Sequence, residues 1–259
     1  MIPQCFVFYF QKISHDTIKF RFKLPSPDHI LGLPVGQHVT MSAKVNGDRV
    51  VRSYTPITPD DVKGYVDFVI KVYKPNEKFP NGGVMSQYLS KLQPGISAID
   101  FLGPLGKIIY LGNGVFQIKE SAKEFRNITV TKLSLVAGGT GITPMFQLIQ
   151  KILQCPKDST KIALLFANNT EDDILLRDEI DSFAREHGDQ FRRWYTIATA
   201  PTRWEYGQGF ITKQMLEEHI NPPADDNLVL ICGPPPMIKL AVSPNLESIG
   251  HKKELCLSY

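Results

Sequence analysis

The sequence predicts an α+β protein of two domains, an antiparallel β-barrel followed by an α/β domain with a parallel sheet. Short strand patterns separated by Gly and Pro turns fill the first part of the chain, which is typical of a small barrel. Apolar strands alternate with amphipathic helices in the second part, which predicts a parallel sheet covered on both faces. The 259 residues are enough for two cores. We place the domains at residues 1–112 and 129–259, with a polar linker at 113–128.

The strands of the barrel are predicted from alternation and from one turn signal. Residues 17–24 alternate apolar and basic side chains, as in a strand with one buried face. Asn46-Gly47 lies between two strand segments, where Asn-Gly is a strong signal for a hairpin turn. The apolar segment 1–10 is expected to be a strand, because a bilayer span needs about 20 residues. The expected strands are 1–10, 17–24, 40–45, 49–54 and 65–73, with a helix at Val84–Leu89.

The second half alternates apolar strand segments with segments of helical spacing. Met145, Leu148 and Ile149, for example, recur as one face of a helix would require. The expected strands are 133–137, 161–167, 192–197 and 228–232, and the expected helices are 144–153, 174–184, 211–219 and from 236 onward.

The composition argues against several classes of protein. A formal net charge of +3 is too small for a nucleic-acid binder, although it favours encounter with an acidic protein. The four cysteines form no C-x-x-C pair, so neither a disulfide framework nor an iron–sulfur loop is expected, and a cytosolic location fits best. The histidines show no metal-ligand spacing, and no G-x-S-x-G signature is present. No transmembrane segment is expected.

Gly138-Gly139-Thr140-Gly141 stands between an apolar strand and an amphipathic helix. Glycines let a backbone approach a phosphate closely, and the free N–H groups of a helix start bind its charge. Thr143 is expected to be the N-cap and Pro144 the first helical residue. The place at the carboxyl end of a parallel strand favours a nucleotide over an unliganded turn.

The barrel half carries a second glycine pair and an aromatic-hydroxyl motif. Gly82-Gly83 precedes the short helix, so its N–H groups offer the same chemistry, although a plain helix start is the better interpretation in isolation. Arg52-Ser53-Tyr54-Thr55 offers a planar cation for a diphosphate, a ring for a flat cofactor and hydroxyls to hydrogen-bond it. Its alternative is a surface arginine beside a core tyrosine. Lys71 and Tyr73 share a strand face that in isolation would simply be solvated.

Cys232-Gly233-Pro234-Pro235-Pro236 ends an apolar strand at the carboxyl edge of the expected sheet. Three prolines would make a rigid rim, and Cys232 would face any ligand there. A buried cysteine followed by a proline turn is an equally good interpretation.

The four motifs follow one another along the chain as Arg52–Thr55, Gly82-Gly83, Gly138–Gly141 and Cys232–Pro236. Together and in this order, they resemble those of the NADH–cytochrome b5 reductase family, in the ferredoxin–NADP reductase superfamily. The resemblance covers nearly the whole chain. It implies FAD in the barrel, NADH in the second domain, and electrons passed singly to cytochrome b5 or another acidic haem protein.

The resemblance also implies a role for each motif. Those expected to bind FAD are Arg52, Ser53, Tyr54, Thr55, Val69, Lys71, Tyr73, Gly83, Val84, Met85, Ser86 and, from the second domain, Thr143. Thr55 would lie near flavin N5, with His38 in a hydrogen-bond relay to it. Those expected to bind the nicotinamide nucleotide are Gly138, Gly139, Thr140, Gly141, Tyr195, Thr196, Cys232, Gly233, Pro234 and Pro235. Thr55, His38 and Cys232 are the expected catalytic residues.

The chain departs from the family pattern in two places. Ala198 stands where the family usually has an acidic residue that accepts hydrogen bonds from the adenosine ribose, so NADPH is a second candidate donor. Ile2 stands where myristoylation requires glycine, so the chain as written cannot carry that lipid. Peripheral attachment to the cytosolic face of the endoplasmic reticulum or of the outer mitochondrial membrane is the alternative to a freely cytosolic protein.

Two other functions fit part of the pattern. A flavin-free dehydrogenase would leave the Arg52–Thr55 and Gly82–Ser86 motifs unexplained. A nucleotide-sensing module would keep the fold without turnover.

Overall fold

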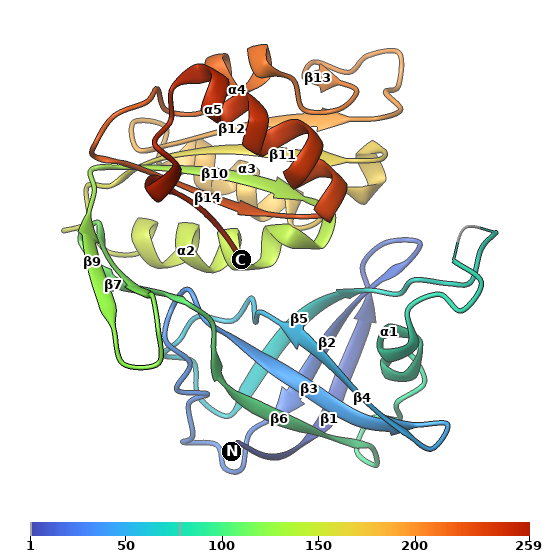
Figure 1. Ribbon diagram of the computed structural model, residues 1–259. Helices are drawn as coiled ribbons and strands as arrows, with labels where there is room; N and C mark the ends of the chain where they lie inside the picture. Colours follow the sequence, from blue (N-terminus) through green and yellow to red (C-terminus); the bar gives the residue numbers. More distant parts are fainter. Residues whose placement is uncertain (1, 78) are drawn as a thin grey trace. The chain divides into compact units, whose positions relative to one another are not determined.

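The computed structural model describes residues 2–77 and 79–259. Its contacts divide the chain into two units, one ending at Gly106 and the other beginning at Lys107. Figure 1 shows the antiparallel strands of the first unit and the sheet with flanking helices of the second. Met1, the first residue of the expected first strand, lies outside the described residues.

The first unit is a six-stranded antiparallel sheet. Its order is β4-β3-β6-β1-β2-β5, so β4 and β5 are the two end strands. The strands are β1 (Ile2–Lys12), β2 (Thr17–Lys23), β3 (His38–Val45), β4 (Asp48–Tyr54), β5 (Tyr65–Lys71) and β6 (Ala98–Leu105), and the one helix among its described residues is α1 (Val84–Leu89).

The hairpin expected at Asn46-Gly47 is confirmed. Asn46 and Gly47 have φ angles of 51° and 94°, and Val45 pairs with Asp48, so the turn has two residues. Positive φ at both turn positions suits the right-handed twist of the flanking strands, and Asn and Gly adopt it at little cost. The hairpin brings Arg52, Ser53 and Tyr54 to an end strand of the sheet.

The sheet curls around a single core, as expected of a barrel. Buried side chains from five strands, with Val50 and Tyr54 of β4 packed against them, form one cluster. The Phe22, Phe68 and Phe101 rings meet edge-to-face at its centre, with centroids 5.1–5.9 Å apart. One core shared by all six strands requires the inward faces to converge, while β4 and β5 have no ladder between them.

The second unit contains a six-stranded parallel sheet with helices on its faces (Figure 1). Its order is β13-β12-β11-β10-β14-β15. The strands are β10 (Lys132–Gly138), β11 (Lys161–Asn168), β12 (Phe191–Ile197), β13 (Gly207–Gln208), β14 (Asn227–Cys232) and β15 (Cys256–Ser258). The α-helices are α2 (Ile142–Leu153), α3 (Arg177–Glu186), α4 (Lys213–His219) and α5 (Ser243–Ile249), preceded by a π-helical segment at Met237–Val242.

This strand order has a switch point between β10 and β14. The chain runs from β10 outward to β11 and β12, then crosses back to β14 on the other side of β10. Ligands of such sheets bind at the carboxyl ends of the strands next to the switch point. Gly138 and Cys232 end these two strands; the sequence predicted the end at Cys232 and placed the other end one residue earlier, at Ala137.

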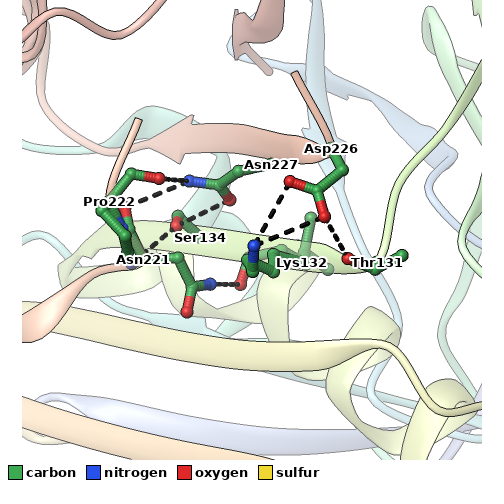
Figure 2. Close-up of polar contacts among 8 residues, drawn as sticks. Thr131, Lys132, Ser134, Asn221, Pro222, Asp226 and Asn227 are labelled. Atoms are coloured by element: carbon green, nitrogen blue, oxygen red, sulfur yellow. Dashed lines mark hydrogen bonds and ion pairs between the residues drawn. The ribbon is translucent and has the colours of Figure 1, made fainter. Parts of the chain in front are cut away.

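A polar clamp sets the register of β10 and β14 at the opposite, amino edge of the sheet (Figure 2). The Ser134 hydroxyl donates to Asn227 Oδ1 at 3.0 Å, and Asn227 Nδ2 donates to the Asn221 carbonyl at 3.1 Å. Asp226 accepts from Thr131 and Lys132, which holds the pKa of its carboxyl below the usual value. Because the strands are parallel, this register also fixes how their carboxyl ends align.

The polar segment expected to be a linker instead forms strands. β7 (Ile108–Gly112), β8 (Val115–Lys119) and β9 (Phe125–Thr129) make a three-stranded antiparallel sheet within the second unit. The buried Asp158 carboxylate accepts hydrogen bonds from the Tyr110 hydroxyl, from Asn113 N at 3.0 Å and from Thr160 Oγ1 at 2.6 Å. This carboxylate joins the small sheet to the rest of the unit, so the boundary moves to 106/107.

Three expected helix starts differ in the structure, and one of them is that of α4, which was expected at 211 and begins at Lys213 after the N-cap Thr212. Helix α2 begins at Ile142 with Gly141 at its N-cap, so Thr143 is not the cap; its hydroxyl donates to the Thr140 carbonyl at 3.2 Å. Helix α3 begins three residues late, because Leu176 adopts the left-handed conformation at φ 58°. No described helix is both long and apolar enough to cross a membrane.

Candidate functional site

The motif Arg52–Thr55 lies at the end of the edge strand β4. The Arg52 guanidinium is exposed and its Nη1 donates to the Val51 carbonyl at 2.7 Å, which leaves most of its donors pointing to solvent. Tyr54 is half-buried against the core, and burial raises the pKa of its phenol to about 12. Its hydroxyl is therefore a neutral hydrogen-bond donor at physiological pH.

The other end strand, β5, presents a row of backbone groups directed away from β2. Asp67 N donates to Thr58 Oγ1 at 2.6 Å, and Asp67 O accepts from Ile57 N at 2.9 Å. Six residues later, the backbone N–H and carbonyl of Tyr73 also point away from β2, and they form hydrogen bonds with Ser86 and Gly83 at the start of α1. Because strand residues alternate, the backbones of Val69 and Lys71 face the same side. The three residues grouped by the sequence, Val69, Lys71 and Tyr73, thus share one edge.

The Lys71 ammonium is held within the protein. Its Nζ lies 2.8 Å from Asp16 Oδ2. We therefore expect any contact of Lys71 with a cofactor to come from its backbone.

The Gly82–Ser86 loop is fitted closely against the end of β5. Gly83 N donates to the Tyr73 carbonyl at 2.8 Å, and Ser86 Oγ accepts from Tyr73 N at 3.1 Å while donating to Gly83 O at 3.0 Å. A Cβ on Gly82 would lie 2.5 Å from Tyr73 O, and one on Gly83 would lie 2.5 Å from Ser86 Oγ. The α1 start has no side-chain cap, so its N–H groups remain available to a phosphate.

His38 and Thr55 reach the same end of the β3–β4 pair. Val39 pairs with Tyr54, which places the preceding and following residues opposite each other. No hydrogen bond joins His38 to Thr55 in the described structure, so the relay between them stays a prediction. Burial lowers the pKa of His38, which keeps its imidazole neutral at physiological pH.

At the carboxyl edge of the second unit, glycines allow the ends of β10 and β14 to touch. A Cβ on Gly141 would lie 2.1 Å from the Cys232 carbonyl oxygen, and one on Gly138 would lie 2.6 Å from Met237 Sδ. Gly233 is equally tight, since its Cβ would lie 2.5 Å from Met237 Cε. The turn Gly139–Gly141 and helix α2 both begin without a side-chain cap in the described structure. Their N–H groups are thus available at the position where the sequence predicts a phosphate site, and binding of a phosphate there stays a prediction.

Cys232 and the prolines after it border this turn. Cys232 is half-buried and burial raises the pKa of its thiol to about 11, so it is protonated at physiological pH. Pro234 and Pro235 are exposed, as a rim requires. Thr143 is buried in α2, and its expected contact with a flavin stays a prediction.

The side chains of Tyr195 and Thr196 lie beneath the carboxyl edge of the parallel sheet and are not exposed at it. Both are fully buried; the Tyr195 hydroxyl donates to Asp181 Oδ1 at 2.8 Å and Thr196 Oγ1 donates to the Gly209 carbonyl at 2.9 Å. Direct side-chain contact with a nucleotide is therefore closed to them. The residues exposed beyond them are Ala198 and Thr199.

Phe210 is a candidate that the sequence analysis did not single out. Its ring is 86% exposed, and the preceding Gly209 donates its N–H to the Ile197 carbonyl at 2.9 Å. A large apolar ring left in solvent at this edge suits stacking on a flat base. The signal in the sequence is the pattern Gly207-Gln208-Gly209-Phe210 after Tyr206.

Asn168, at the end of β11, has a buried side-chain amide. Neither its Nδ2 nor its Oδ1 has a hydrogen-bond partner among the described residues. Leaving such a group unsatisfied costs about 1–3 kcal/mol, which points to a partner that arrives with a ligand or with water.

The two units match two described families. Residues 4–110 match the family described as "Oxidoreductase FAD-binding domain" and residues 135–243 match "Oxidoreductase NAD-binding domain". The chain is 55% identical over 252 residues to NADH-cytochrome b5 reductase 2 of Gallus gallus, covering 96% of this chain and 83% of that one. It is 50% identical to NADH-cytochrome b5 reductase 3 of Rattus norvegicus, covering 95% and 83%. The solved cytochrome b5 reductase domain of Ulva prolifera nitrate reductase superposes with a TM-score of 0.93 at 38% identity, covering 99% and 97%.

The fold and the two backbone sites define a flavin- and nicotinamide-nucleotide-dependent oxidoreductase. The edge of β5 with the tight Gly82-Gly83 turn fits FAD, and the glycine turn before α2 fits the diphosphate of NADH. The chain belongs to the NADH–cytochrome b5 reductase family.

Proposed function

We propose that this protein takes a hydride from NADH and delivers electrons one at a time to cytochrome b5. The observation that carries this proposal is the pair of glycine turns that open helices without a side-chain cap, one in each unit. When bound, FAD supplies the chemistry that turns a two-electron hydride into single electrons. The protein supplies binding, orientation and electrostatics.

In the first unit, the two end strands hold the flavin cofactor. The backbone edge of Val69 and Lys71 would hydrogen-bond the flavin ring or its ribityl chain, and the α1 start with Arg52 would bind the diphosphate. The Tyr54 phenol would lie against the ring, and Thr55 with His38 would hydrogen-bond near N5. The support is that β4 and β5 carry these residues and that the loop before α1 is locked to Tyr73.

In the second unit, the carboxyl edge binds the nicotinamide nucleotide. The N–H groups of Gly139–Gly141 would bind the diphosphate, and Phe210 would stack on the adenine. Cys232 with Pro234 and Pro235 would border the nicotinamide and exclude water from it. The tight contact of Gly141 with Cys232 supports this, because it sets both parts of the site at a fixed separation.

An acidic haem protein is the proposed acceptor. The formal charge of +3 favours such a partner, and the names of the relatives make cytochrome b5 the specific choice. All four cysteines are free thiols, which supports a reducing compartment such as the cytosol.

Anaerobic stopped-flow mixing tests the function. The purified protein is expected to be yellow, to bleach on addition of NADH, and to reduce cytochrome b5 when the two are then mixed. A colourless protein that oxidises NADH with a small substrate would instead favour the flavin-free dehydrogenase. A flavin that NADH does not bleach would favour the sensing module.

Arg52→Ala tests the flavin site directly. We expect lower FAD content after gel filtration, because a diphosphate would lose a bidentate cation. Arg49→Ala is the matched control, since Arg49 lies on the same strand but donates to Ser42 Oγ at 3.0 Å. Equal FAD content in both variants and the wild type would remove Arg52 from the site.

A further inference from the structure

The loop between β12 and β13, residues 198–206, leaves the carboxyl edge and returns beside it. We propose that this loop is a binding site for the 2′-phosphate of NADPH, with Arg203 as its cation, so that the protein accepts NADPH as well as NADH. The inference rests on the proposed function, because it specifies the donor for the same nucleotide site.

Backbone hydrogen bonds place the loop next to the ends of β11 and β12. Ala198 N donates to the Asn168 carbonyl at 3.0 Å, and Thr199 N donates to the Asn169 carbonyl at 2.8 Å. The side chains of Ala198 and Thr199 are exposed there. The return of the chain, from Gly209 N to the Ile197 carbonyl, brings Phe210 to the same place. A base stacked on Phe210 would therefore have its ribose near Ala198.

The ends of these strands lack the acidic group that selects against a 2′-phosphate. In dinucleotide folds, a carboxylate at such a position binds the ribose hydroxyls of NAD, whereas a nearby arginine accommodates the phosphate of NADP. Here β11 ends at Asn168 and is followed by Asn169-Thr170, and β12 is followed by Ala198-Thr199-Ala200-Pro201-Thr202-Arg203. Neither of these segments contains Asp or Glu; the first acidic residue after β11 is Glu171, which is paired with Arg177.

Arg203 stands at a turn that is fixed by its neighbours. Trp204 N donates to the Pro201 carbonyl at 3.2 Å, which makes Thr202 and Arg203 the central residues of the turn. Trp204 Nε1 donates to the Gly207 carbonyl at 2.8 Å and so anchors the turn to β13. Arg203 is exposed and has no acidic partner in the part of the chain that the structure describes.

Two acidic groups near the loop, Glu171 and Asp181, are paired with other arginines. Glu171 Oε1 lies 2.5 Å from Arg177 Nη1, and Asp181 Oδ1 lies 2.7 Å from Arg193 Nε. The Arg177 guanidinium lies 5.6 Å from the centre of the Trp204 ring. Glu205 is the one acidic side chain within the loop itself. A phosphate would therefore meet the Arg203 charge and the Thr199 hydroxyl.

Direct binding of nucleotide fragments is the sharpest test. Calorimetry on the FAD-loaded full chain would compare adenosine 2′,5′-bisphosphate with ADP, which lacks the 2′-phosphate. We expect Arg203→Gln to weaken the bisphosphate about tenfold, the effect of losing one charge-assisted contact, and to leave ADP unchanged. Ala198→Asp should weaken the bisphosphate by a similar factor through repulsion and strengthen ADP slightly.

Arg185→Gln is the matched control. Arg185 is exposed in the last turn of α3, and that ten-residue helix is about 15 Å long, so the variant removes the same charge away from the edge. It should leave both affinities unchanged. The ratio of kcat/KM for NADPH to that for NADH should fall in Arg203→Gln and Ala198→Asp but not in Arg185→Gln.

Equal loss of ADP and bisphosphate binding in Arg203→Gln would overturn the proposal, as would no loss of either. So would equal bisphosphate losses in the Arg203 and Arg185 variants, which would show only a general charge effect. The fragments bind without electron transfer, so this outcome is separate from the function itself. Failure of both NADH and NADPH to bleach the flavin would sink the proposed function while leaving the phosphate site intact.

Discussion

The two glycine turns, Gly82-Gly83 and Gly138–Gly141, have similar chemistry but rest on different frames. The first is locked to the end of one edge strand through Tyr73 and Ser86, and it opens a helix of six residues. The second is wedged between two central strands of a parallel sheet, and it opens a buried helix of twelve residues. The first frame gives a cofactor an additional line of backbone partners along β5. The second offers only a strand end, which suits a nucleotide that must leave.

The largest expected effect separates two neighbouring glycines of the second turn. Gly141→Ala should lower the free energy of unfolding by more than about 3 kcal/mol, because its Cβ would lie 2.1 Å from the Cys232 carbonyl oxygen and the backbone would have to move. Gly139→Ala meets nothing within 4 Å and should cost about 1–2 kcal/mol for its φ of 54°. Denaturant unfolding monitored by circular dichroism measures both. Similar losses in the two variants would mean that the contact with Cys232 is not the constraint.

The first turn should respond through cofactor loss rather than unfolding. Ser86→Ala removes the hydroxyl that joins Tyr73 N to Gly83 O, and should cost about 1–2 kcal/mol of stability. FAD retention should fall several-fold, because the N–H groups of α1 lose their fixed position. Ser90→Ala is a control, since Ser90 Oγ donates within the same helix, to Gln87 O at 2.8 Å. FAD content is read from the absorbance ratio after gel filtration; equal retention in both variants would contradict the role of Ser86.

Cys232→Ala should slow flavin reduction by NADH while leaving FAD content unchanged. Burial raises the pKa of its thiol to about 11, above the ordinary value of about 8.5, so folding favours the protonated form. Burial of the protonated Cys232 thiol therefore contributes to stability below about pH 8.5, and this contribution is lost as the pH rises toward the pKa of the thiol in the folded protein. The wild-type reduction rate should therefore show no titration of this thiol between about pH 6 and 9. Stopped-flow rates that change with an apparent pKa near 8 in the wild type, but not in Cys232→Ala, would refute this.

The smallest expected effect is at Asn168. Asn168→Ala removes a buried amide without a partner, so stability should stay level or rise by up to about 1 kcal/mol, while nucleotide affinity falls about threefold. Asn169→Ala, at an exposed neighbouring position, should change neither. A variant that loses stability and keeps its affinity for NADH would show that the amide serves the fold alone.

Patterns within single elements predicted most of the fold. The Asn46-Gly47 hairpin, the strand alternation and the glycine turn before α2 depend on residues that are close in sequence, and the structure confirms them. The failures involve distant partners. The segment expected as a linker is held by Asp158, which is far along the chain and carries no local signal at residues 113–128.

The candidate site follows the same division. Glycines and the aromatic-hydroxyl motif could be recognised from sequence, because each has a local chemical meaning. Tyr195 and Thr196 are buried and support the strand end, whereas Phe210 is exposed beside them. Both facts depend on how β13 pairs with β12. No spacing rule in the sequence anticipates that return.

The outward edge of β5 has a consequence for the protein before it acquires its cofactor. An end strand, which has a neighbour in its sheet on one side only, is a template for pairing with another chain. Between the anchored ends at Asp67 and Tyr73, this edge lies next to no other strand of its sheet. Flavin binding at the proposed site would cover it, so the cofactor would also protect newly made copies from associating with one another. Preparations short of FAD are therefore expected to aggregate, and light scattering should fall as flavin is restored.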